Sequence, residues 1–282
     1  MTSIAALLTQ GQELLSDSES PLIDAQVLLC HVLDVDRSYF YKSPEEIVPE
    51  QQKYKYFDLI EKRRQGIPVS HLTGKREFWS LDLNVNKHTL IPRPETEHLV
   101  EAALAIINQG KIKHIADLGT GTGAIALSLA TEISKTFPDC LIIATDISPE
   151  ALEVASKNIA KLPLKNITLR KGNWCEALDN SKFDLIVSNP PYITENHQCL
   201  SEGDVQHEPM LALKSGADGL NAIREIIQDA PNSMTPEAWL VLEHGYDQKE
   251  IIQQLLRDRG FKMIETRQDY ANLDRITLGQ WP

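Results

Sequence analysis

One short run, Asn189-Pro190-Pro191-Tyr192, carries the clearest chemistry in this chain, and it follows a predicted strand at residues 184–188. Proline fixes the backbone and lacks an N–H donor, so nearby carbonyls stay free to accept hydrogen bonds. The side-chain oxygen of Asn189 and the backbone carbonyl of Pro190 can then accept from one planar NH2 group, on which Tyr192 can stack. We interpret Asn189, Pro190 and Tyr192 as catalytic, and the whole run, Pro191 included, as the binding site of a substrate NH2 group.

A glycine-rich turn earlier in the chain predicts a cofactor site. The run 114–126 has the pattern of a buried strand, then Gly119-Thr120-Gly121-Thr122-Gly123, then the start of a helix. Glycines let the backbone approach a ligand closely and tolerate positive φ. We expect the loop from Asp117 to Gly123, with Thr120 and Thr122, to bind the cofactor. Gly119, Gly121 and Ala124 also satisfy the dinucleotide pattern, so the loop alone fits both S-adenosyl-L-methionine and NAD.

Two later positions fit a nucleoside. Asp146 ends the predicted strand 141–146, where a carboxylate can accept hydrogen bonds from both hydroxyls of a ribose. Its alternative role is a helix cap before Ser148-Pro149-Glu150. Trp174, after Gly172-Asn173, stands where a purine would lie and can stack on adenine, although a core tryptophan is the competing interpretation.

The proline run decides between the cofactors. An amide nitrogen is a poor nucleophile, because its lone pair is delocalised into the carbonyl. Acceptors that hold both N–H bonds raise the electron density on the nitrogen and aim it at the methyl group of a sulfonium. The methylated nitrogen is acidic and sheds its proton, so neither a metal nor a general base is needed. We therefore expect S-adenosyl-L-methionine as the cofactor and no metal.

The elements that position these residues fall into two parts. From Ile4 to about Gly74 apolar residues recur at helical spacing, which predicts a small helical domain over residues 1–75. Residues Phe78 to Leu90 alternate apolar and polar side chains, which predicts a β-hairpin linker over residues 76–93. Over 94–282, β-branched runs at 112–117, 141–146, 184–188 and 239–243 alternate with helical stretches. This pattern predicts an α/β domain with a Rossmann-like parallel sheet.

Composition excludes several classes of protein. The 282 residues carry 28 Lys and Arg against 40 Asp and Glu, a formal net charge of −12, which disfavours the phosphate neutralisation needed by nucleic-acid binders. The four cysteines form neither a CxxC pair nor a Cys/His cluster. No basic leader precedes the first apolar stretch, and no apolar run reaches about 20 residues. We expect a cytoplasmic protein with no membrane partner and no direct nucleic-acid partner.

The combined motifs resemble the peptide-chain release factor glutamine N5-methyltransferases over nearly the whole chain. The stretches that carry the resemblance are residues 91–97 (Ile-Pro-Arg-Pro-Glu-Thr-Glu), 117–126, 189–192, Glu208-Pro209, Glu243-His244-Gly245, Asp269-Tyr270 and Asp274-Arg275. The resemblance implies a class I methyltransferase sheet, cofactor contacts at Gly119–Gly123, Asp146, Trp174 and Asn189, and a substrate amide held by Asn189–Tyr192. It also implies that the substrate is the glutamine of the Gly-Gly-Gln motif of release factors, in support of translation termination.

Some positions depart from the pattern or stay open. Asn173 stands where relatives often place a carboxylate for the adenine amino group, and an asparagine accepts only through its amide oxygen. The stretch 193–219 is long for a connection and is a candidate substrate-facing loop. We assign no chemistry to His207 or Cys199, and we expect His244 to orient the loop around the site rather than to exchange a proton.

Three other functions compete with glutamine methylation. Adenine N6-methyltransferases of nucleic acids use the same logic, because adenine also presents an NH2 group on a planar carbon, but they must extract and hold a base. The acidic charge and the lack of a basic recognition module count against that function. An NAD-dependent oxidoreductase and a non-catalytic cofactor-binding module both leave Asn189–Tyr192 unexplained. We also expect residues 1–75 to recognise the substrate protein, with a purely structural role as the alternative.

Overall fold

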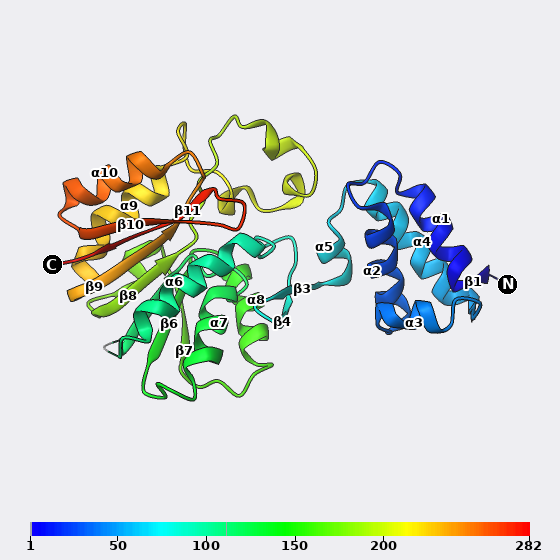
Figure 1. The fold of residues 1–282 in the computed structure, drawn as a ribbon, viewed down its shortest axis with the longest axis horizontal. Helices are drawn as coiled ribbons and strands as arrows, with labels where there is room; N and C mark the ends of the chain where they lie inside the picture. Colours follow the sequence, from blue (N-terminus) through cyan, green and yellow to red (C-terminus); the bar gives the residue numbers. More distant parts are fainter. Residues whose placement is uncertain (1, 111) are drawn as a thin grey trace. The chain divides into compact units, whose positions relative to one another are not determined.

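The computed structural model describes residues 2–110 and 112–282, which divide into two compact units (Figure 1). The first unit contains the residues up to Lys75 together with Ser201–His207. The second contains Arg76–Leu200 and Glu208–Pro282. The chain therefore leaves the second unit after Leu200 and returns to it at Glu208.

The first unit is a helical bundle, as the spacing of its apolar residues predicts. Its core consists of fully buried side chains such as Leu7, Leu28, Leu29, Tyr56 and Ile60. Ser3 begins the first helix, because its side chain accepts from the backbone N–H of Ala6. The helices are α1 (Ile4–Leu14), α2 (Pro21–Leu33), α3 (Arg37–Lys42), α4 (Glu50–Arg64) and α5 (Val69–Thr73), and the strands β1 (Thr2–Ser3) and β2 (Ile47–Val48) pair antiparallel.

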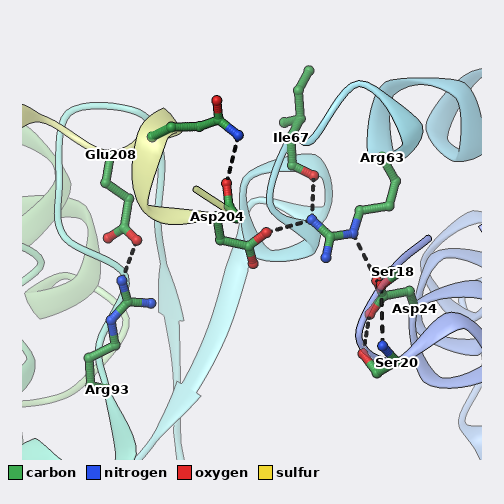
Figure 2. Close-up of polar contacts among 10 residues, drawn as sticks. Ser18, Ser20, Asp24, Arg63, Ile67, Arg93, Asp204 and Glu208 are labelled. Carbon is green, nitrogen blue, oxygen red and sulfur yellow. Dashed lines mark hydrogen bonds and ion pairs between the residues drawn. The ribbon is translucent and has the colours of Figure 1, made fainter. Parts of the chain in front are cut away.

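Arg63, on α4, joins the returning segment Ser201–His207 to the bundle (Figure 2). Its guanidinium donates to Asp24 at 2.8 Å and to Asp204 at 2.5 Å. The side chains of Arg63 and Asp24 are only 13% and 9% exposed, so both carboxylates compensate a cation that water hardly reaches. Ser18 and Ser20 donate to the same Asp24, so both of its carboxylate oxygens accept hydrogen bonds.

The second unit is built on a mostly parallel sheet. Its strands are β5 (His114–Leu118), β6 (Leu141–Asp146), β7 (Ile167–Lys171), β8 (Phe183–Ser188), β9 (Met234–Glu243), β10 (Lys262–Gln268) and β11 (Asp274–Gln280). Within the described residues this is a seven-stranded sheet of order β10-β11-β9-β8-β5-β6-β7, in which only β11 runs against the others. The predicted α/β arrangement is confirmed.

Helices cover both faces of this sheet (Figure 1). They are α6 (Glu97–Ile107), α7 (Ala124–Ile133), α8 (Pro149–Ile159), α9 (Asn221–Asp229) and α10 (Lys249–Arg259). One buried cluster joins α6 and α7 to one face, and a second joins α9 and α10 to the other. Side chains of a strand point alternately to the two faces, so Ile115 belongs to the first cluster and Ala116 to the second.

Short elements complete this unit. The strands β3 (Lys75–Phe78) and β4 (Leu81–Asn84) form a hairpin whose two-residue turn, Trp79-Ser80, has φ of 52° and 57°. The side chains of Glu97 and Glu132 accept from the backbone and ring N–H groups of Trp79 and hold this turn. The 3-10 helices of the chain are η1 (Pro94–Thr96), η2 (Trp174–Leu178), η3 (Gln198–Ser201), η4 (Val205–His207), η5 (Met210–Ala212) and η6 (Ala230–Ser233).

Candidate active site

A cavity of about 400 Å³ opens in the second unit, outside the carboxyl ends of β5, β6 and β8. In an open α/β sheet this edge is where ligands bind. Its lining includes the predicted residues Gly119, Thr120, Gly121, Thr122, Asp146, Trp174, Asn189 and Pro191. Further lining comes from Thr96 and from most residues of 88–92, some residues of 209–216, and Asn221, Ala222 and Glu225. Segments far apart in the sequence therefore meet at one place.

The glycine loop between β5 and α7 approaches the cavity with backbone alone. Gly119 has φ of 72°, and a Cβ there would lie 2.9 Å from the ring of Trp174. Gly121 has φ of 55°, and among the described residues a Cβ there would meet no atom within 4 Å. Its position on the lining means that this open space belongs to the cavity. The loop thus leaves room for a ligand where other residues would place a side chain.

Buried polar groups support the glycine loop on the side away from the cavity. Asp117 is fully buried and accepts from the hydroxyl of Thr120 at 2.6 Å. Burial raises the pKa of the Asp117 carboxyl to about 7, and the hydrogen bond from Thr120 opposes that shift. On the other side, the amide of Asn158 donates to the carbonyls of Thr122 and Asn84. Two residues that the sequence predicts to bind the cofactor, Asp117 and Gly123, are not part of the cavity lining. Gly123 is the N-cap of α7, and both residues support the loop.

Asp146 presents its carboxylate to the cavity at the end of β6. One oxygen accepts from the backbone N–H of Gly121 at 2.8 Å and the other from Ser148 at 2.9 Å. Burial raises the pKa of Asp146, and these N–H bonds act against that shift. The N-cap of α8 is Ser148, so Asp146 does not cap the helix itself. The carboxylate can accept a further hydrogen bond from a donor in the cavity, such as a ligand hydroxyl.

Trp174 and Asn173 lie on the cavity wall, after β7. Trp174 packs on Gly119 and has a positive φ of 37°, a conformation that a non-glycine residue adopts only at a cost of about 1 to 3 kcal/mol. The amide nitrogen of Asn173 donates to Glu225 of α9 at 2.5 Å. That bond fixes the amide and leaves its oxygen as the free acceptor. Glu225, which also lines the cavity, adds a carboxylate that the sequence pattern did not reveal.

The proline run follows β8 at the same edge. Asn189 lines the cavity, and its side-chain nitrogen donates to the hydroxyl of Thr96 at 3.0 Å. Pro191 also lines the cavity, whereas Pro190 is buried and is not part of the lining, so acceptance of a substrate hydrogen bond by its carbonyl stays a prediction. Tyr192 packs against the buried cluster under α9 and α10, and its carbonyl accepts from Gln248. Stacking of Tyr192 on a substrate stays a prediction, because the ring stands beside Glu243 behind the cavity lining.

The long segment after the proline run forms one wall of the cavity. Residues 193–195 bond to the backbone of residues 213–216, which closes the segment into an ordered loop. Glu208 anchors its middle: one carboxylate oxygen accepts from the backbone N–H of Ile91 at 2.8 Å, and the other pairs with Arg93 (Figure 2). Two motifs of the sequence, the run beginning at Ile91 and Glu208-Pro209, therefore meet in space and fix the wall that begins at Pro209.

The residues to which we assign no chemistry lie in structural settings. His244 is fully buried, its ring nitrogens bond to the carbonyl of Gly245 and the hydroxyl of Thr277, and burial lowers its pKa. A neutral ring between these partners orients the turn after β9. His207 belongs to the helical unit and packs against Gly66. Cys199 lies in η3, within the segment that leaves the second unit.

The site therefore has the parts that S-adenosylmethionine requires, and they come from residues of the chain itself. Space at Gly121 suits a ligand held by backbone N–H groups, Asp146 suits two ribose hydroxyls, and Trp174 offers an aromatic face. Thr96 and Glu225 complete the wall, and sequence reasoning missed both. Thr96 stands in the motif 91–97 and could have been found there, whereas Glu225 sits on an amphipathic helix with no local signal.

Family models match most of the chain. A model of the PrmC N-terminal domain matches residues 6–74, and a model of a methyltransferase domain matches residues 110–268. Among the described residues, no helix has the length and apolar character of a membrane span.

Curated relatives are similar over the full length. The chain is 47% identical to the release factor glutamine methyltransferase of Vibrio cholerae over 285 residues, covering 100% of this chain and 97% of the relative. It is 46% identical to that of Pseudomonas aeruginosa, covering 100% and 99%, and 44% identical to that of Escherichia coli, covering 95% of each.

Solved structures share the fold at low identity. The hMettl16 catalytic domain, solved with an RNA hairpin, has a TM-score of 0.57 at 15% identity, covering 80% of this chain and 82% of its own. A 16S rRNA methyltransferase of T. thermophilus, solved with AdoMet and guanosine, has a TM-score of 0.53 at 16% identity, covering 74% and 50%. These likenesses confirm the class I methyltransferase sheet and carry no argument about the substrate.

Proposed function

This chain belongs to the release factor glutamine methyltransferase family, and we propose that it methylates the side-chain amide nitrogen N5 of a glutamine in peptide-chain release factors. The methyl donor is S-adenosylmethionine, and the glutamine is that of the Gly-Gly-Gln motif. We propose that the activity supports translation termination and takes place in the cytoplasm, with the ribosome.

One observation carries the proposal: a single cavity brings Asn189 together with the glycine loop and Asp146. An amide-binding acceptor and a nucleoside-binding carboxylate in the same cavity are what a transfer between a nucleoside cofactor and an NH2 group needs. An oxidoreductase would have no use for Asn189-Pro190. The full-length identity to release factor glutamine methyltransferases then favours a glutamine as the group that enters.

The residues of the chain act mainly by positioning. The side-chain oxygen of Asn189 and the carbonyl of Pro190 accept from the two N–H bonds of the substrate amide, which fixes its plane and raises the electron density on nitrogen. Asp146 would hold ribose hydroxyls of the cofactor, and the backbone of the glycine loop, which lines the same cavity, would contact another part of it. When bound, S-adenosylmethionine supplies an electrophilic methyl group on a sulfonium. The released proton goes to water, so no residue here has to act as a base.

The helical unit supplies substrate specificity in this proposal. The amide site recognises a group that every glutamine carries, so selection of one glutamine requires contacts with the body of the substrate protein. The helical unit exposes large apolar side chains, Leu22, Ile23, Tyr41 and Tyr54, which suit a protein partner. With more acidic than basic side chains, it does not suit nucleic acid.

An unbiased labelling experiment tests the proposal. The purified chain is incubated with labelled S-adenosylmethionine and a bacterial lysate, and the labelled macromolecules are separated and identified. We expect the label in release factors and insensitive to nuclease. A label that appears in nucleic acid would instead establish adenine methylation, which uses an NH2 group of the same geometry.

A further inference from the structure

Three neighbouring strands of the parallel sheet offer contacts to a nucleoside in order. In the sheet β5, β6 and β7 lie side by side, and after them come the glycine loop, Asp146 and Asn173, all of which contribute to the cavity lining. The backbone N–H of Gly172 donates to the carbonyl of Asp146 at 3.1 Å, which joins the end of β7 to the residue whose carboxylate is assigned to the ribose. A base attached to that ribose therefore lies near Asn173.

Apolar side chains contribute to this part of the lining. Ile147 follows Asp146 and is 47% exposed, yet it belongs to the cavity lining, and Trp174 and Ala222 add further apolar surface. Exposed apolar surface of this kind is unfavourable in water and gains free energy when a flat apolar ring covers it. These residues suit a planar base, but they do not tell one base from another. In such pockets that distinction comes from a few polar groups.

Asn173 and Glu225 form a polar pair in this lining. The side-chain nitrogen of Asn173 donates to the Oε1 atom of Glu225, on α9, at 2.5 Å. An ionised carboxylate only accepts, so the nitrogen end of the Asn173 amide must face Glu225 and the oxygen end must face away from it. Glu225 is exposed and lines the cavity, and the neighbouring Arg224 pairs with Asp218 instead. The pair therefore keeps its negative charge at the cavity.

We infer that Glu225 is a specificity-determining residue of the cofactor site: it orients the Asn173 amide, so that the pair offers oxygen acceptors to the base and selects a purine with an exocyclic amino group. An asparagine alone would not make this selection, because its amide can turn and offer its NH2 end. A purine with a carbonyl in place of the amino group would bring its oxygen against these acceptors. The inference rests on the proposed function, because it concerns how that enzyme holds its methyl donor.

Binding measurements with two nucleoside thioethers test the inference without any turnover. Titration calorimetry of the full chain compares S-adenosylhomocysteine with S-inosylhomocysteine, which has a carbonyl in place of the amino group. Wild type should prefer the adenosine compound by at least roughly 10-fold, the scale of one hydrogen bond to a charged group.

Glu225→Gln should reduce this preference. Whichever way the amides of Asn173 and the new glutamine pair, one of them has an NH2 group to offer the base. Affinity for S-adenosylhomocysteine should therefore fall roughly 3- to 10-fold, and affinity for S-inosylhomocysteine should not fall with it. The matched control is Glu176→Gln, which removes the same charge from an exposed residue of η2 outside the cavity lining. This control should keep both wild-type affinities.

An exchange of charge between the two residues gives a second, independent test. Asn173→Asp alone sets two carboxylates against each other, so S-adenosylhomocysteine should bind roughly 10-fold more weakly than to wild type. Adding Glu225→Gln to that variant restores one amide beside one carboxylate, and it should recover most of the affinity and the preference for the adenosine compound.

The possible outcomes separate the inference from the proposed function. Equal affinities of wild type for the two compounds, or an unchanged preference in Glu225→Gln, would overturn the role of Glu225. A double variant that binds no better than Asn173→Asp would overturn it as well. Failure of the wild-type chain to bind S-adenosylhomocysteine would instead overturn the proposed function.

Discussion

Two aspartates illustrate how the same side chain takes different roles at the edge of the sheet. Asp117 is sealed beneath the glycine loop and accepts from Thr120, whereas Asp146 opens onto the cavity and accepts only from backbone N–H groups. Both carboxylates have raised pKa values because of burial. Only Asp146 has lone pairs that a ligand can reach. We therefore assign ligand binding to Asp146 and support of the loop to Asp117.

The first prediction concerns Asn189. Asn189→Ala removes one preorganised acceptor, so turnover should fall roughly 10² to 10³-fold while cofactor affinity changes little. Asn189→Asp keeps an acceptor of similar shape and adds a negative charge near a sulfonium, which should tighten cofactor binding and leave partial activity. Single-turnover rates and cofactor affinities measured on the same samples provide both quantities. Near-normal turnover in Asn189→Ala would contradict the assigned mechanism.

The second prediction concerns Asp146. Asp146→Ala should weaken cofactor binding by roughly 1.5 to 3 kcal/mol, the range for hydrogen bonds to a charged acceptor. Titration calorimetry measures this affinity. Asp146→Asn is the matched control: it keeps the shape and one acceptor oxygen, so its loss should be smaller. An unchanged affinity in a folded Asp146→Ala would mean that other residues hold the ribose.

At the residue scale, a role can be predicted from the sequence where consecutive residues form the feature. The proline run and the glycine loop could be assigned because neighbouring residues specify the geometry. The hydrogen bond between Asn189 and Thr96 could not be predicted, because the two residues come from distant segments of the chain. The pairing of Asn173 with Glu225 escapes for the same reason.

At the scale of elements, the segment 193–219 is the least regular part of the chain and yet is held at several points. Its ends bond to each other, Glu208 bonds to Ile91 and Arg93, and Asp204 pairs with Arg63 in the helical unit. The bonds made within the second unit, between the ends of the segment and from Glu208, explain how a long connection forms a defined cavity wall. The predicted domain boundaries, after residue 75 and after residue 93, stay a proposal. They place Ser201–His207 in the domain 94–282, whereas in the structure these residues belong to the first unit.

The third prediction tests the anchor at Arg63. Arg63→Met removes the cation and leaves the buried Asp24 without its charged partner, so the free energy of unfolding should fall by about 2 to 3 kcal/mol. Amide exchange in residues 201–207 should become faster. Denaturant unfolding and hydrogen exchange measure the two effects. Arg64→Met is the matched control, because Arg64 pairs with Glu61 on the exposed side of the same helix. Equal stability of both variants would show that Arg63 contributes no more than a surface pair.

The antiparallel edge of the sheet shows why some elements escape prediction. β10 and β11 carry many polar residues and pair with register shifts, so neither has the apolar run of a buried parallel strand. The parallel strands β5, β6 and β8 do have such runs, and their predicted positions agree with the structure to within two residues.

At the scale of the whole molecule, the fourth prediction separates recognition from catalysis. Removal of residues 1–75 should preserve cofactor affinity, because the cavity lies within the second unit, and should suppress methylation of an intact release factor. The segment 201–207 would lose its partners in such a protein, so a short Gly/Ser linker should replace it. Calorimetry and a methylation assay on the same preparation measure both effects.

A small substrate gives the control for that experiment. A peptide that contains Gly-Gly-Gln is too short to contact the helical unit, so the full chain and the shortened protein should methylate it at similar rates. If the shortened protein binds cofactor and methylates the intact release factor at the full rate, the helical unit has no role in recognition.

The most direct test of the central claim is to locate the transferred methyl group on a purified release factor. The full-length chain, the release factor and S-adenosylmethionine are incubated together, and fragmentation mass spectrometry assigns the modified atom. We predict one added methyl group on the side-chain nitrogen of the glutamine in Gly-Gly-Gln, absent when Asn189→Ala replaces the wild-type chain for the same short time. A methyl group on any other residue, or an unmodified release factor beside a methylated nucleic acid, would contradict the account.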